Sequence, residues 1–365
     1  MKGMETDTFL MKGNEAVAHA AVRYGCDGFF GYPITPQSEI LETLSALKPW
    51  ETTGMVVLQS ESELASINMV YAGGSTGKCV MTSSSSPGVA LMQEGISYMA
   101  ACEVPGLIVS VQRGGPGLGT IQPSQSDYIQ AVYGGGNGDY HVIVLAPASV
   151  QEMADMVGEA FELMFRWRMP VMILSDGSIG QMMEKVRLPH QKPRRSDEEI
   201  RGDCPWAVNG MGLAGRKPNF MSSLELDPLV MEERNRRMSA KYEAVSRSEA
   251  RYEDYCCDDA EVLIVAYGIA SRVSLGAVET LRGQGIKAGL MRPKTLWPFP
   301  QDHLRELASK AKAVLVVELS EGQLYGDVCR FTQGLAPVQL LSHSGGVRVT
   351  PDEVVRKVKD MLTGK

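Results

Sequence analysis

Met55-Val-Val-Leu58 is a short run of apolar residues, and Glu63-Leu-Ala-Ser-Ile-Asn-Met-Val-Tyr-Ala-Gly-Gly74 follows it after a short polar segment. The β-branched run predicts a strand over 56–59, and the second stretch predicts a helix of small residues that begins near Glu63. Ligands of open α/β sheets bind at the carboxyl ends of the strands, where each strand passes into a helix. The stretch therefore predicts an α/β fold with an acid at its binding edge.

The rest of the chain repeats this alternation of strands and helices. In the first half we expect strands over 27–32, 78–82, 106–111, 142–145 and 171–175, and helices over 14–24, 37–47, 87–102 and 150–166. In the second half we expect strands over 261–267, 287–292, 313–318 and 338–342, with helices beginning near Ala270, Gln301 and Glu321 and a last helix over 351–362. Such alternation is typical of parallel sheets with helices on both faces.

Two domains are expected, because 365 residues are too many for one ordinary core. Residues 1–190 would form the first domain and residues 258–365 a smaller, doubly wound second domain. Residues 191–257 would be a linker, in which irregular chain precedes a solvated helix over 228–254 that bridges the domains. The charged run Met231-Glu-Glu-Arg-Asn-Arg-Arg237 is typical of such an exposed helix face.

Composition argues against several classes of partner. The formal net charge is −7, which disfavours binding to nucleic acid or to an anionic membrane. No apolar run approaches the roughly 20 residues needed to cross a bilayer, and the polar start of the chain resembles neither a signal nor a transit peptide. We therefore expect a cytoplasmic protein. The seven cysteines lack metal-ligand spacing and are expected to be buried or incidental thiols: Cys26, Cys79, Cys102, Cys204, Cys256, Cys257 and Cys329.

Two segments besides Glu63 could bind a ligand. Tyr32-Pro-Ile-Thr-Pro36 follows a strand and forms a rigid turn that would present Thr35, although this segment taken alone is better explained as a simple stiff turn with Thr35 capping the next helix. Val109-Ser-Val-Gln-Arg-Gly-Gly-Pro-Gly-Leu-Gly-Thr120 ends a strand at Arg113 and continues through four glycines. An arginine there can clamp a carboxylate with two parallel hydrogen bonds, and the alternative is a flexible loop with an exposed arginine.

Glu61 and Glu63 cannot both face one pocket, because residues two apart on a helix point to different sides. Glu63 shares its side with Ile67 and Val70, which favours burial, whereas Glu61 shares its side with Asn68. Negative charge in the first turn also complements a helix dipole, and that role suits Glu61. We keep both residues as candidates.

Together these segments resemble the subunit of 2-oxoacid:ferredoxin oxidoreductases that carries the pyrimidine-binding and transketolase C-terminal-like domains. The resemblance extends from Phe9 to Leu362. Its most specific segments are Gly31-Tyr-Pro-Ile-Thr-Pro36, Gln59-Ser-Glu-Ser-Glu-Leu-Ala65, Gln112-Arg-Gly-Gly-Pro116, Gln125-Ser-Asp127 and Arg292-Pro-Lys-Thr-Leu-Trp-Pro298. The nearest enzymes are those acting on 2-oxoisovalerate and other branched-chain 2-oxoacids. The segments that resemble these branched-chain enzymes are Arg113-Gly-Gly-Pro-Gly-Leu-Gly119, Gln93-Glu-Gly-Ile-Ser-Tyr98 and Leu145-Ala-Pro-Ala-Ser-Val-Gln-Glu152.

The resemblance implies a thiamine diphosphate-binding, pyrimidine-type doubly wound sheet followed by a transketolase C-terminal-like domain. Glu63 would be the acid that activates the cofactor, with Glu61 as the fallback, and Thr35 and Arg113 would hold the substrate carboxylate. The implied cofactor-binding residues are Tyr32, Pro33, Ile34, Thr35, Glu63, Ser85 and Pro87. The implied substrate-binding residues are Thr35, Arg113, Leu118, Gln125 and Asp127.

The resemblance also implies partner subunits. A thiamine site needs a Gly-Asp-Gly turn and a later Asn for its metal and diphosphate, and Gly136-Asn-Gly-Asp139 only faintly echoes that pattern. Mg2+ and the diphosphate would therefore be held by a beta subunit, and [4Fe-4S] clusters by a small ferredoxin-like subunit, with a gamma subunit as a further candidate. No metal is expected on this chain. Coenzyme A would accept the acyl group, and ferredoxin the electrons.

Two departures from the family pattern leave alternatives open. Ser86 stands where the family turn Thr-Ser-Gly-Pro-Gly has its first glycine, which keeps open a noncatalytic assembly subunit. Relatives specific for 2-oxoglutarate often have Pro-Ser-Thr-Gly after the arginine, whereas this chain has Pro116-Gly-Leu-Gly119, and a leucine suits an apolar substrate tail. Oxidative decarboxylation of a branched-chain 2-oxoacid is the first hypothesis, and a 2-oxoglutarate enzyme or a transketolase is the rival.

Overall fold

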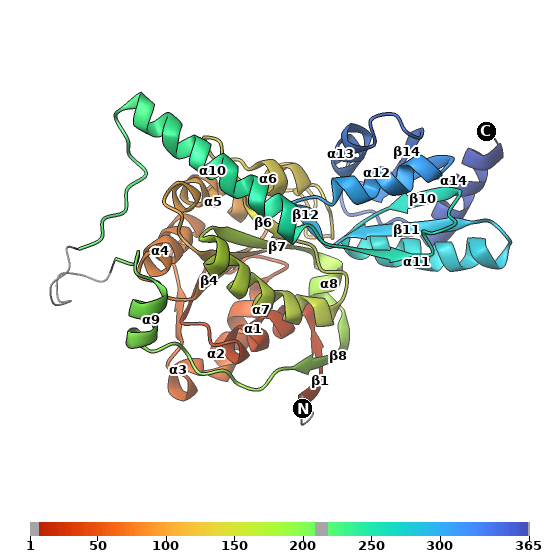
Figure 1. The fold of residues 1–365 in the computed structure, drawn as a ribbon. Helices are drawn as coiled ribbons and strands as arrows, with labels where there is room; N and C mark the ends of the chain where they lie inside the picture. Colours follow the sequence, from red (N-terminus) through yellow and green to blue (C-terminus); the bar gives the residue numbers. More distant parts are fainter. Residues whose placement is uncertain (1–6, 209–217, 364–365) are drawn as a thin grey trace, which may run out of the picture.

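The computed structural model describes residues 7–208 and 218–363, which form two α/β units side by side (Figure 1). The larger unit has a seven-stranded sheet in the order β12-β6-β7-β5-β4-β2-β3, and the smaller has a five-stranded sheet in the order β14-β13-β10-β11-β9. A separate antiparallel pair, β1 (Asp7–Lys12) with β8 (Met183–Leu188), lies beside the larger unit.

Six strands of the large sheet come from the first half of the chain and run parallel. They are β2 (Gly28–Gly31), β3 (Val56–Gln59), β4 (Val80–Ser84), β5 (Gly106–Gln112), β6 (Ile143–Leu145) and β7 (Pro170–Asp176). The main helices that connect them are α1 (Gly13–Arg23), α2 (Ser38–Leu47), α4 (Glu63–Ser75), α5 (Ser86–Ala101) and α7 (Val150–Trp167). Each of these elements was expected from the sequence, with bounds that shift by a few residues at most.

The large sheet is not wholly parallel, because β12 (Thr295–Trp297) pairs antiparallel with β6 at one edge. β12 belongs to the second half of the sequence, so the two halves are interleaved at this point. The strand is held by long-range contacts, including stacking of Trp297 on His141 with ring centroids 4.4 Å apart. Three residues are too few for a periodic pattern, which is why the sequence did not predict this strand.

The small sheet contains the four expected strands β10 (Val262–Val265), β11 (Ala288–Pro293), β13 (Ala313–Glu318) and β14 (Val338–Ser342). Its helices are α11 (Gly268–Gly283), α12 (Gln301–Lys310), α13 (Gln323–Thr332) and α14 (Pro351–Thr363). A fifth strand, β9 (Tyr252–Tyr255), pairs antiparallel with β11. The solvated helix expected over 228–254 is therefore too long: α10 (Pro228–Glu249) ends earlier, and sheet pairing decides the conformation of 252–255.

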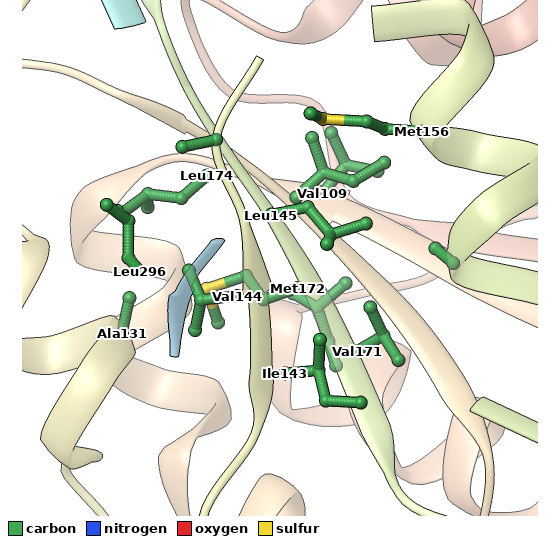
Figure 2. Packing of buried hydrophobic residues seen from close by; sticks show 14 of the residues in the cluster. Val109, Ala131, Ile143, Val144, Leu145, Met156, Val171, Met172, Leu174 and Leu296 are labelled. Atoms are coloured by element: carbon green, nitrogen blue, oxygen red, sulfur yellow. The ribbon is translucent and has the colours of Figure 1, made fainter. Parts of the chain in front are cut away.

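The core of the large unit forms where strands with continuous apolar runs are covered on both faces. In Figure 2, Leu145 of β6 lies near Val109 and Met156, whereas the neighbouring Val144 points toward Leu296 on β12. Successive residues of a strand point to opposite faces, so this one strand contributes to two layers of the core. Leu296 brings the second half of the chain into the first unit's core.

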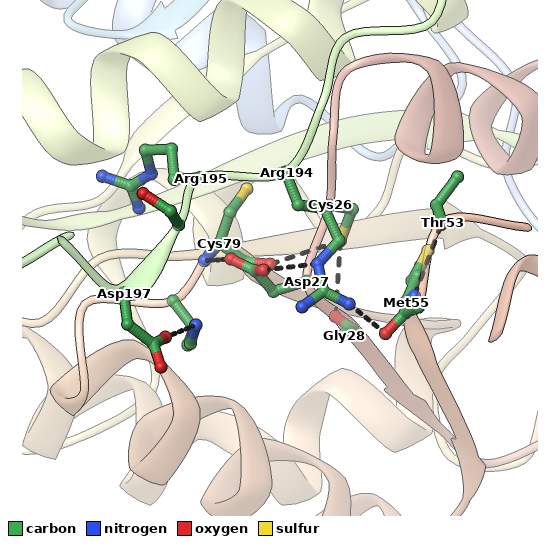
Figure 3. Close-up of polar contacts among 12 residues, drawn as sticks. Cys26, Asp27, Gly28, Thr53, Met55, Cys79, Arg194, Arg195 and Asp197 are labelled. Carbon is green, nitrogen blue, oxygen red and sulfur yellow. Dashed lines mark hydrogen bonds and ion pairs between the residues drawn. The ribbon is translucent and has the colours of Figure 1, made fainter. Parts of the chain in front are cut away.

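The segment that follows β8 packs back against the amino ends of β2 and β4 (Figure 3). The guanidinium of Arg194 pairs with the buried carboxylate of Asp27 at 2.9 Å, and the backbone N–H of Cys79 donates to the same carboxylate at 2.8 Å. This segment, expected to be part of a linker, is thus anchored to the first unit. All seven cysteines lie among the described residues and are free thiols.

Shorter helices complete the description: α3 (Pro49–Thr52), α6 (Tyr128–Tyr133), α8 (Gly177–Gln181) and α9 (Asp197–Asp203). Among the described helices, none combines the length and the apolar character needed to cross a membrane.

Candidate cofactor and substrate site

The carboxyl ends of four neighbouring strands meet at one edge of the large sheet. In the order β5-β4-β2-β3, these strands end at Gln112, Ser84, Gly31 and Gln59. The main candidate cofactor and substrate residues follow these four ends within a few residues, and the ends lie at the same edge because all four strands run parallel. The topology therefore gathers Thr35, Glu63, the Ser85–Pro87 turn and Arg113 at a single edge.

Glu63 is the first residue of α4 and is only 7% exposed. Ser62 caps this helix, and its hydroxyl accepts a hydrogen bond from Ala65 N–H at 3.2 Å. Among the described residues, the Glu63 carboxylate has no hydrogen-bond or ion-pair partner, and buried carboxylates are otherwise almost always paired. Glu61 is exposed to solvent. Of the two candidate acids, Glu63 is thus the one whose carboxylate is available inside the edge.

Tight packing surrounds the Glu63 carboxylate. A Cβ atom added to Gly88 in the first turn of α5 would lie 2.6 Å from Glu63 Oε1 and 2.1 Å from Ser84 Oγ, so only glycine fits there. The Ser84 and Ser85 hydroxyls are buried and have no hydrogen-bond partner. Pro87 is the second residue of α5, where its missing N–H costs nothing. An unpaired acid with two unpaired hydroxyls nearby is typical of a site built for a polar ligand.

Arg113 directly follows β5 and is buried, so the alternative of a flexible loop with an exposed arginine is wrong. Its Nη1 donates to the carbonyl oxygen of Thr35 and its Nη2 to the carbonyl oxygen of Leu118, both at 3.0 Å. The Nε–H is buried without a partner. The guanidinium is thus held by two neutral carbonyls and keeps a free donor.

The remaining members of the turn and loop are more exposed. Tyr32, Pro33 and Thr35 are exposed and Ile34 is half-buried. The turn is anchored by Gln37, whose side-chain amide donates to the Tyr32 carbonyl at 3.0 Å. The Leu118 side chain is 80% exposed. These residues form the outer wall of the edge, and Glu63 and Arg113 form its interior.

Asp127 and Ser86 contact each other beside Arg113. The Ser86 hydroxyl hydrogen-bonds the Asp127 carboxylate and also accepts from the backbone N–H of Arg113 at 3.1 Å. Burial raises the pKa of Asp127 to about 6, although the Ser86 hydrogen bond and the charge of Arg113 act in the opposite direction. The residue that departs from the family glycine is therefore bonded to two candidate substrate-binding residues.

Gln125 lies deeper than expected for a residue at the mouth of a site. It is fully buried, its Nε2 donates to the Tyr267 carbonyl at 2.9 Å, and its Oε1 accepts from Leu319 N–H at 2.9 Å. Tyr267 and Leu319 belong to the second unit. Both ends of the side-chain amide are hydrogen-bonded to the second unit, and we therefore assign Gln125 a structural role at the junction of the two units.

Sequence reasoning missed two buried polar residues at this edge, Gln112 and Asp176. Gln112 ends β5, and its Oε1 accepts from Asp127 N–H at 3.0 Å. Asp176 ends β7 and accepts from Ser178, Ile179 and, across the units, Ile269 N–H. Burial raises the pKa of Asp176 to about 6, against these hydrogen bonds. The sequence signal that could have identified both residues is a polar residue at the carboxyl end of an otherwise largely apolar strand.

A cavity of about 690 Å³ adjoins the turn and lies between the two units. Thr35 lines it from the first unit, the start of α11 lines it from the second, and Ile121 and Arg348 are among the other residues that line it. A small organic acid fits in a space of this size. Of the candidate site residues, Thr35 alone lines this cavity, so the cavity adjoins the Tyr32–Pro36 turn and not Glu63 or Arg113.

Comparison with known proteins identifies the family. The family model described as pyruvate flavodoxin/ferredoxin oxidoreductase, thiamine diphosphate-binding, matches residues 19–252, and the model described as pyruvate:ferredoxin oxidoreductase core domain II matches residues 260–354. The chain belongs to the 2-oxoacid:ferredoxin oxidoreductase family. The resemblance drawn from the sequence is thereby confirmed, as is the thiamine-type α/β fold class.

Named members of the 2-oxoacid:ferredoxin oxidoreductase family match nearly the whole chain. The ketoisovalerate oxidoreductase subunit VorB of Methanothermobacter thermautotrophicus is 47% identical, over 97% of this chain and 98% of that protein. The 2-oxoglutarate synthase subunit KorA of Methanothermobacter marburgensis is 36% identical, over 98% and 100%. Both of these subunits are thus similar to this chain over nearly its whole length.

Solved structures agree with this assignment. The 2-oxoglutarate:ferredoxin oxidoreductase of Magnetococcus marinus, solved with 2-oxoglutarate, coenzyme A and succinyl-CoA bound, superimposes with a TM-score of 0.82 at 28% identity and covers 97% of this chain. This chain spans 65% of that longer one. A split-gene transketolase shares the fold with a TM-score of 0.59 at 15% identity, over 96% of this chain and 97% of that one. The protein is one subunit of a 2-oxoacid:ferredoxin oxidoreductase complex.

Proposed function

We propose that this chain supplies the aminopyrimidine half of a thiamine diphosphate site in a complex that oxidatively decarboxylates a branched-chain 2-oxoacid such as 2-oxoisovalerate. The products would be an acyl-CoA and CO2, with reduction of ferredoxin. The observation that carries this proposal is the Glu63 side chain, which is only 7% exposed and whose carboxylate has no partner among the described residues at the carboxyl edge of the sheet.

The residues at this edge fit the aminopyrimidine ring. Thiamine diphosphate, when bound, supplies a carbon nucleophile and an electron sink for 2-oxoacid chemistry. Glu63 would hydrogen-bond a ring nitrogen, for which a carboxylate without a competing partner is required. Gly88 leaves room for the Glu63 side chain beside α5, and the Ser85 hydroxyl is free to bond a ligand. Tyr32, Pro33, Ile34 and Pro87 would form the walls of this half-site.

Arg113 and Thr35 would hold the substrate carboxylate. The free Nε–H of Arg113 is a charged donor in a buried place, where a hydrogen bond to an anion is strong. The Thr35 hydroxyl stands at the same turn whose carbonyl already accepts from Arg113. Fixing the carboxylate orients the keto carbon toward the cofactor, and orientation is a major source of catalytic acceleration.

We assign the other parts of the reaction to partner subunits. A beta subunit would hold the diphosphate and Mg2+, because this sequence has no Gly-Asp-Gly turn with a later Asn. A small ferredoxin-like subunit would hold the [4Fe-4S] clusters, and a gamma subunit is a further candidate. Coenzyme A would be the cosubstrate. A cytoplasmic location is part of the proposal, supported by seven free cysteines.

The branched-chain preference rests on two observations. Of the two curated relatives named above, the ketoisovalerate oxidoreductase subunit is the more similar, at 47% identity against 36% for the 2-oxoglutarate synthase subunit. The loop after Arg113, residues 114–121, carries no charged side chain that could pair with a second carboxylate, and leaving one unpaired is costly. The apolar Leu118 in this loop suits an alkyl tail. 2-Oxoglutarate is the second candidate substrate, because the 2-oxoglutarate synthase subunit also matches 98% of this chain.

The test uses the complex reconstituted from this chain and its partner subunits. We expect ferredoxin reduction with 2-oxoisovalerate to exceed that with 2-oxoglutarate at equal concentration. We expect Glu63→Gln to reduce turnover on the order of a hundredfold or more, since it removes the ionisable group that activates the cofactor. Thiamine diphosphate binding, followed by fluorescence or calorimetry, should persist in this variant more weakly.

Glu61→Gln is the matched control, because Glu61 is exposed and lies two residues away. It should leave turnover within about twofold of the parent complex. A Glu63→Gln complex that assembles and turns over normally would remove Glu63 from the mechanism and favour the noncatalytic assembly alternative. A higher rate with 2-oxoglutarate would reassign the substrate but not the cofactor site.

A further inference from the structure

One hydroxyl connects three segments of the site that are far apart in the sequence. Ser86 Oγ, on the first residue of α5, accepts from Arg113 N–H at 3.1 Å and lies 3.2 Å from the Arg113 carbonyl oxygen. The same oxygen hydrogen-bonds Asp127 Oδ2. Asp127 is itself fixed by its N–H, which donates to Gln112 Oε1 at 3.0 Å. The starts of α5 and α6 and the end of β5 therefore meet at Ser86.

We propose that Ser86 and Asp127 are positioning residues that hold Arg113 and adjust how much of its positive charge reaches the substrate carboxylate. The inference rests on the proposed role of Arg113 in binding that carboxylate. Neither Ser86 nor Asp127 needs to touch the substrate for this effect, because Ser86 bonds the Arg113 backbone and Asp127 acts on Arg113 by charge.

Hydrogen-bond counting gives two arrangements of the group. A serine hydroxyl has one proton to donate and can accept two hydrogen bonds. When Asp127 is ionised, Ser86 donates its proton to the carboxylate. Of the two Arg113 backbone groups, only the N–H is then bonded to Ser86. When Asp127 is protonated, it can donate to Ser86 Oγ, which frees the Ser86 proton for the Arg113 carbonyl oxygen. Arg113 is then held by Ser86 through both its N–H and its carbonyl.

The charge of Asp127 has the same effect as the hydrogen bonds, because protonation of Asp127 strengthens the attraction between Arg113 and the substrate carboxylate. An ionised Asp127 offsets the positive charge of Arg113, whereas a neutral Asp127 leaves the guanidinium free to attract the substrate. Burial raises the pKa of Asp127 to about 6, so both forms are populated in a mildly acidic range. The groups that act electrostatically with Asp127 are Arg113 and Tyr267 of the second unit. Burial raises the pKa of Tyr267 well above its usual range, so Tyr267 stays neutral where Asp127 titrates.

The first experiment measures steady-state ferredoxin reduction by the reconstituted complex from about pH 5 to about pH 8. For the parent protein, we expect KM for 2-oxoisovalerate to rise with pH around the pKa of Asp127. Asp127→Asn should abolish this rise, because an amide carries no charge at any of these pH values. Ser86→Ala should raise KM about tenfold with a smaller change in kcat, since a buried hydrogen bond to the Arg113 backbone is lost.

The pH profile of Ser86→Ala adds a distinct signature. The Ser86 hydrogen bond lowers the pKa of Asp127, so its removal should move the rise in KM to higher pH. Ser86→Thr keeps a hydroxyl and should restore the parental profile. Thr82→Val is the matched control, because Thr82 on β4 also carries a buried hydroxyl but has no hydrogen-bond partner to lose. It should leave KM and its pH dependence unchanged.

The second experiment does not depend on activity. We expect phenylglyoxal to modify Arg113 in the full chain several times faster in Ser86→Ala than in the parent, with the modified residue identified by mass spectrometry. The reason is that the parental backbone contact keeps Arg113 buried. This readout keeps the inference testable if the complex proves inactive on every 2-oxoacid, a result that would overturn the proposed function instead.

An unchanged KM, pH profile and modification rate in Ser86→Ala would overturn the inference. A fall in kcat alone would do the same, because it would assign Ser86 to the cofactor turn. If Ser86→Ala folds poorly by circular dichroism, Asp127→Asn decides the matter, since it keeps the shape of the side chain and removes its negative charge. A pH-dependent KM in Asp127→Asn identical to that of the parent would also contradict the proposal.

Discussion

Gly88 and Glu63 are packed so closely that no side chain fits between them: a Cβ on Gly88 would lie 2.6 Å from Glu63 Oε1 and 2.8 Å from Glu63 Cγ. The contact joins the first turns of α4 and α5 at the carboxyl edge of the large sheet. The position of the Glu63 carboxylate therefore depends on the absence of a side chain on the neighbouring helix.

Gly88→Ala should displace the Glu63 carboxylate and reduce ferredoxin reduction by the complex on the order of a hundredfold, because small displacements of a reacting group are expensive. The added methyl group should also lower the free energy of unfolding by about 1–3 kcal/mol through overpacking. The matched control is Gly276→Ala in α11, where an added Cβ meets nothing within 4 Å. Gly276→Ala should stabilise the chain by up to about 1 kcal/mol and leave activity intact. Full activity in Gly88→Ala would show that Glu63 tolerates displacement.

Asp176 should make the chain less stable as pH rises. Burial raises its pKa from 3.8 to about 6, so the folded chain binds this proton more tightly than the unfolded chain. Its contribution to the free energy of unfolding is therefore greatest below pH 3.8, declines as pH rises toward about 6, and is constant above that. The total decline is about 3 kcal/mol.

Denaturant unfolding of the parent and of Asp176→Asn across this pH range measures the effect. The free energy of unfolding of the parent minus that of Asp176→Asn should fall as pH rises, because the aspartate titrates and the amide does not. Asp360→Asn is the control, since Asp360 is exposed on α14, and this substitution should change the free energy of unfolding by no more than about 0.5 kcal/mol. A flat difference for Asp176→Asn would contradict the raised pKa.

The ion pair between Arg292 and Glu152 should couple the two units. Arg292 on β11 is 6% exposed and donates two parallel hydrogen bonds to the Glu152 carboxylate on α7, at 2.9 Å and 2.7 Å. Glu152→Gln should lower the free energy of unfolding by about 2–3 kcal/mol, because the buried guanidinium keeps only Glu253 and Gln carries no charge. In a double-mutant cycle with Arg292→Met, the two losses should be strongly non-additive. Simple additivity would mean that this pair does not link the units.

Leu145 should be one of the costliest truncations in the core. It is fully buried on β6 and packs in the cluster shown in Figure 2. Leu145→Ala should lower the free energy of unfolding by about 2–5 kcal/mol, because the cavity left behind cannot fully close. The same change at Leu229, which is exposed at the start of α10, should stay within about 0.5 kcal/mol. Equal losses at both positions in chemical denaturation would argue against the packing described for β6.

The elements that were predictable from the sequence are those that local patterns specify. The bounds expected for β3, Val56 and Gln59, agree with the structure, and α4 begins at Glu63 as expected. β9 and β12 were not predicted, because four and three residues become strands only through pairing with β11 and β6. Long-range pairing also ends α10 at Glu249 and explains the error in the expected helix end.

The candidate site residues show the same difference between what local sequence specifies and what long-range contacts decide. The sequence identified Arg113 as a strand-end arginine but left its burial open, and the structure buries it against the carbonyls of Thr35 and Leu118. Gln125 was expected near the substrate, yet its amide bonds the second unit. Such hydrogen bonds leave no periodic or compositional trace, because their partners are distant in the sequence.

The amino-acid sequence by itself determined the alternation of parallel strands with their connecting helices, the acid at a strand-to-helix junction and membership of the family, because these depend on neighbouring residues and short motifs. Only the tertiary structure decided that Glu63 rather than Glu61 is buried, and that Ser86 meets an aspartate 41 residues away. Burial and contact depend on how separate segments pack around one sheet edge, and that information is distributed over the whole chain.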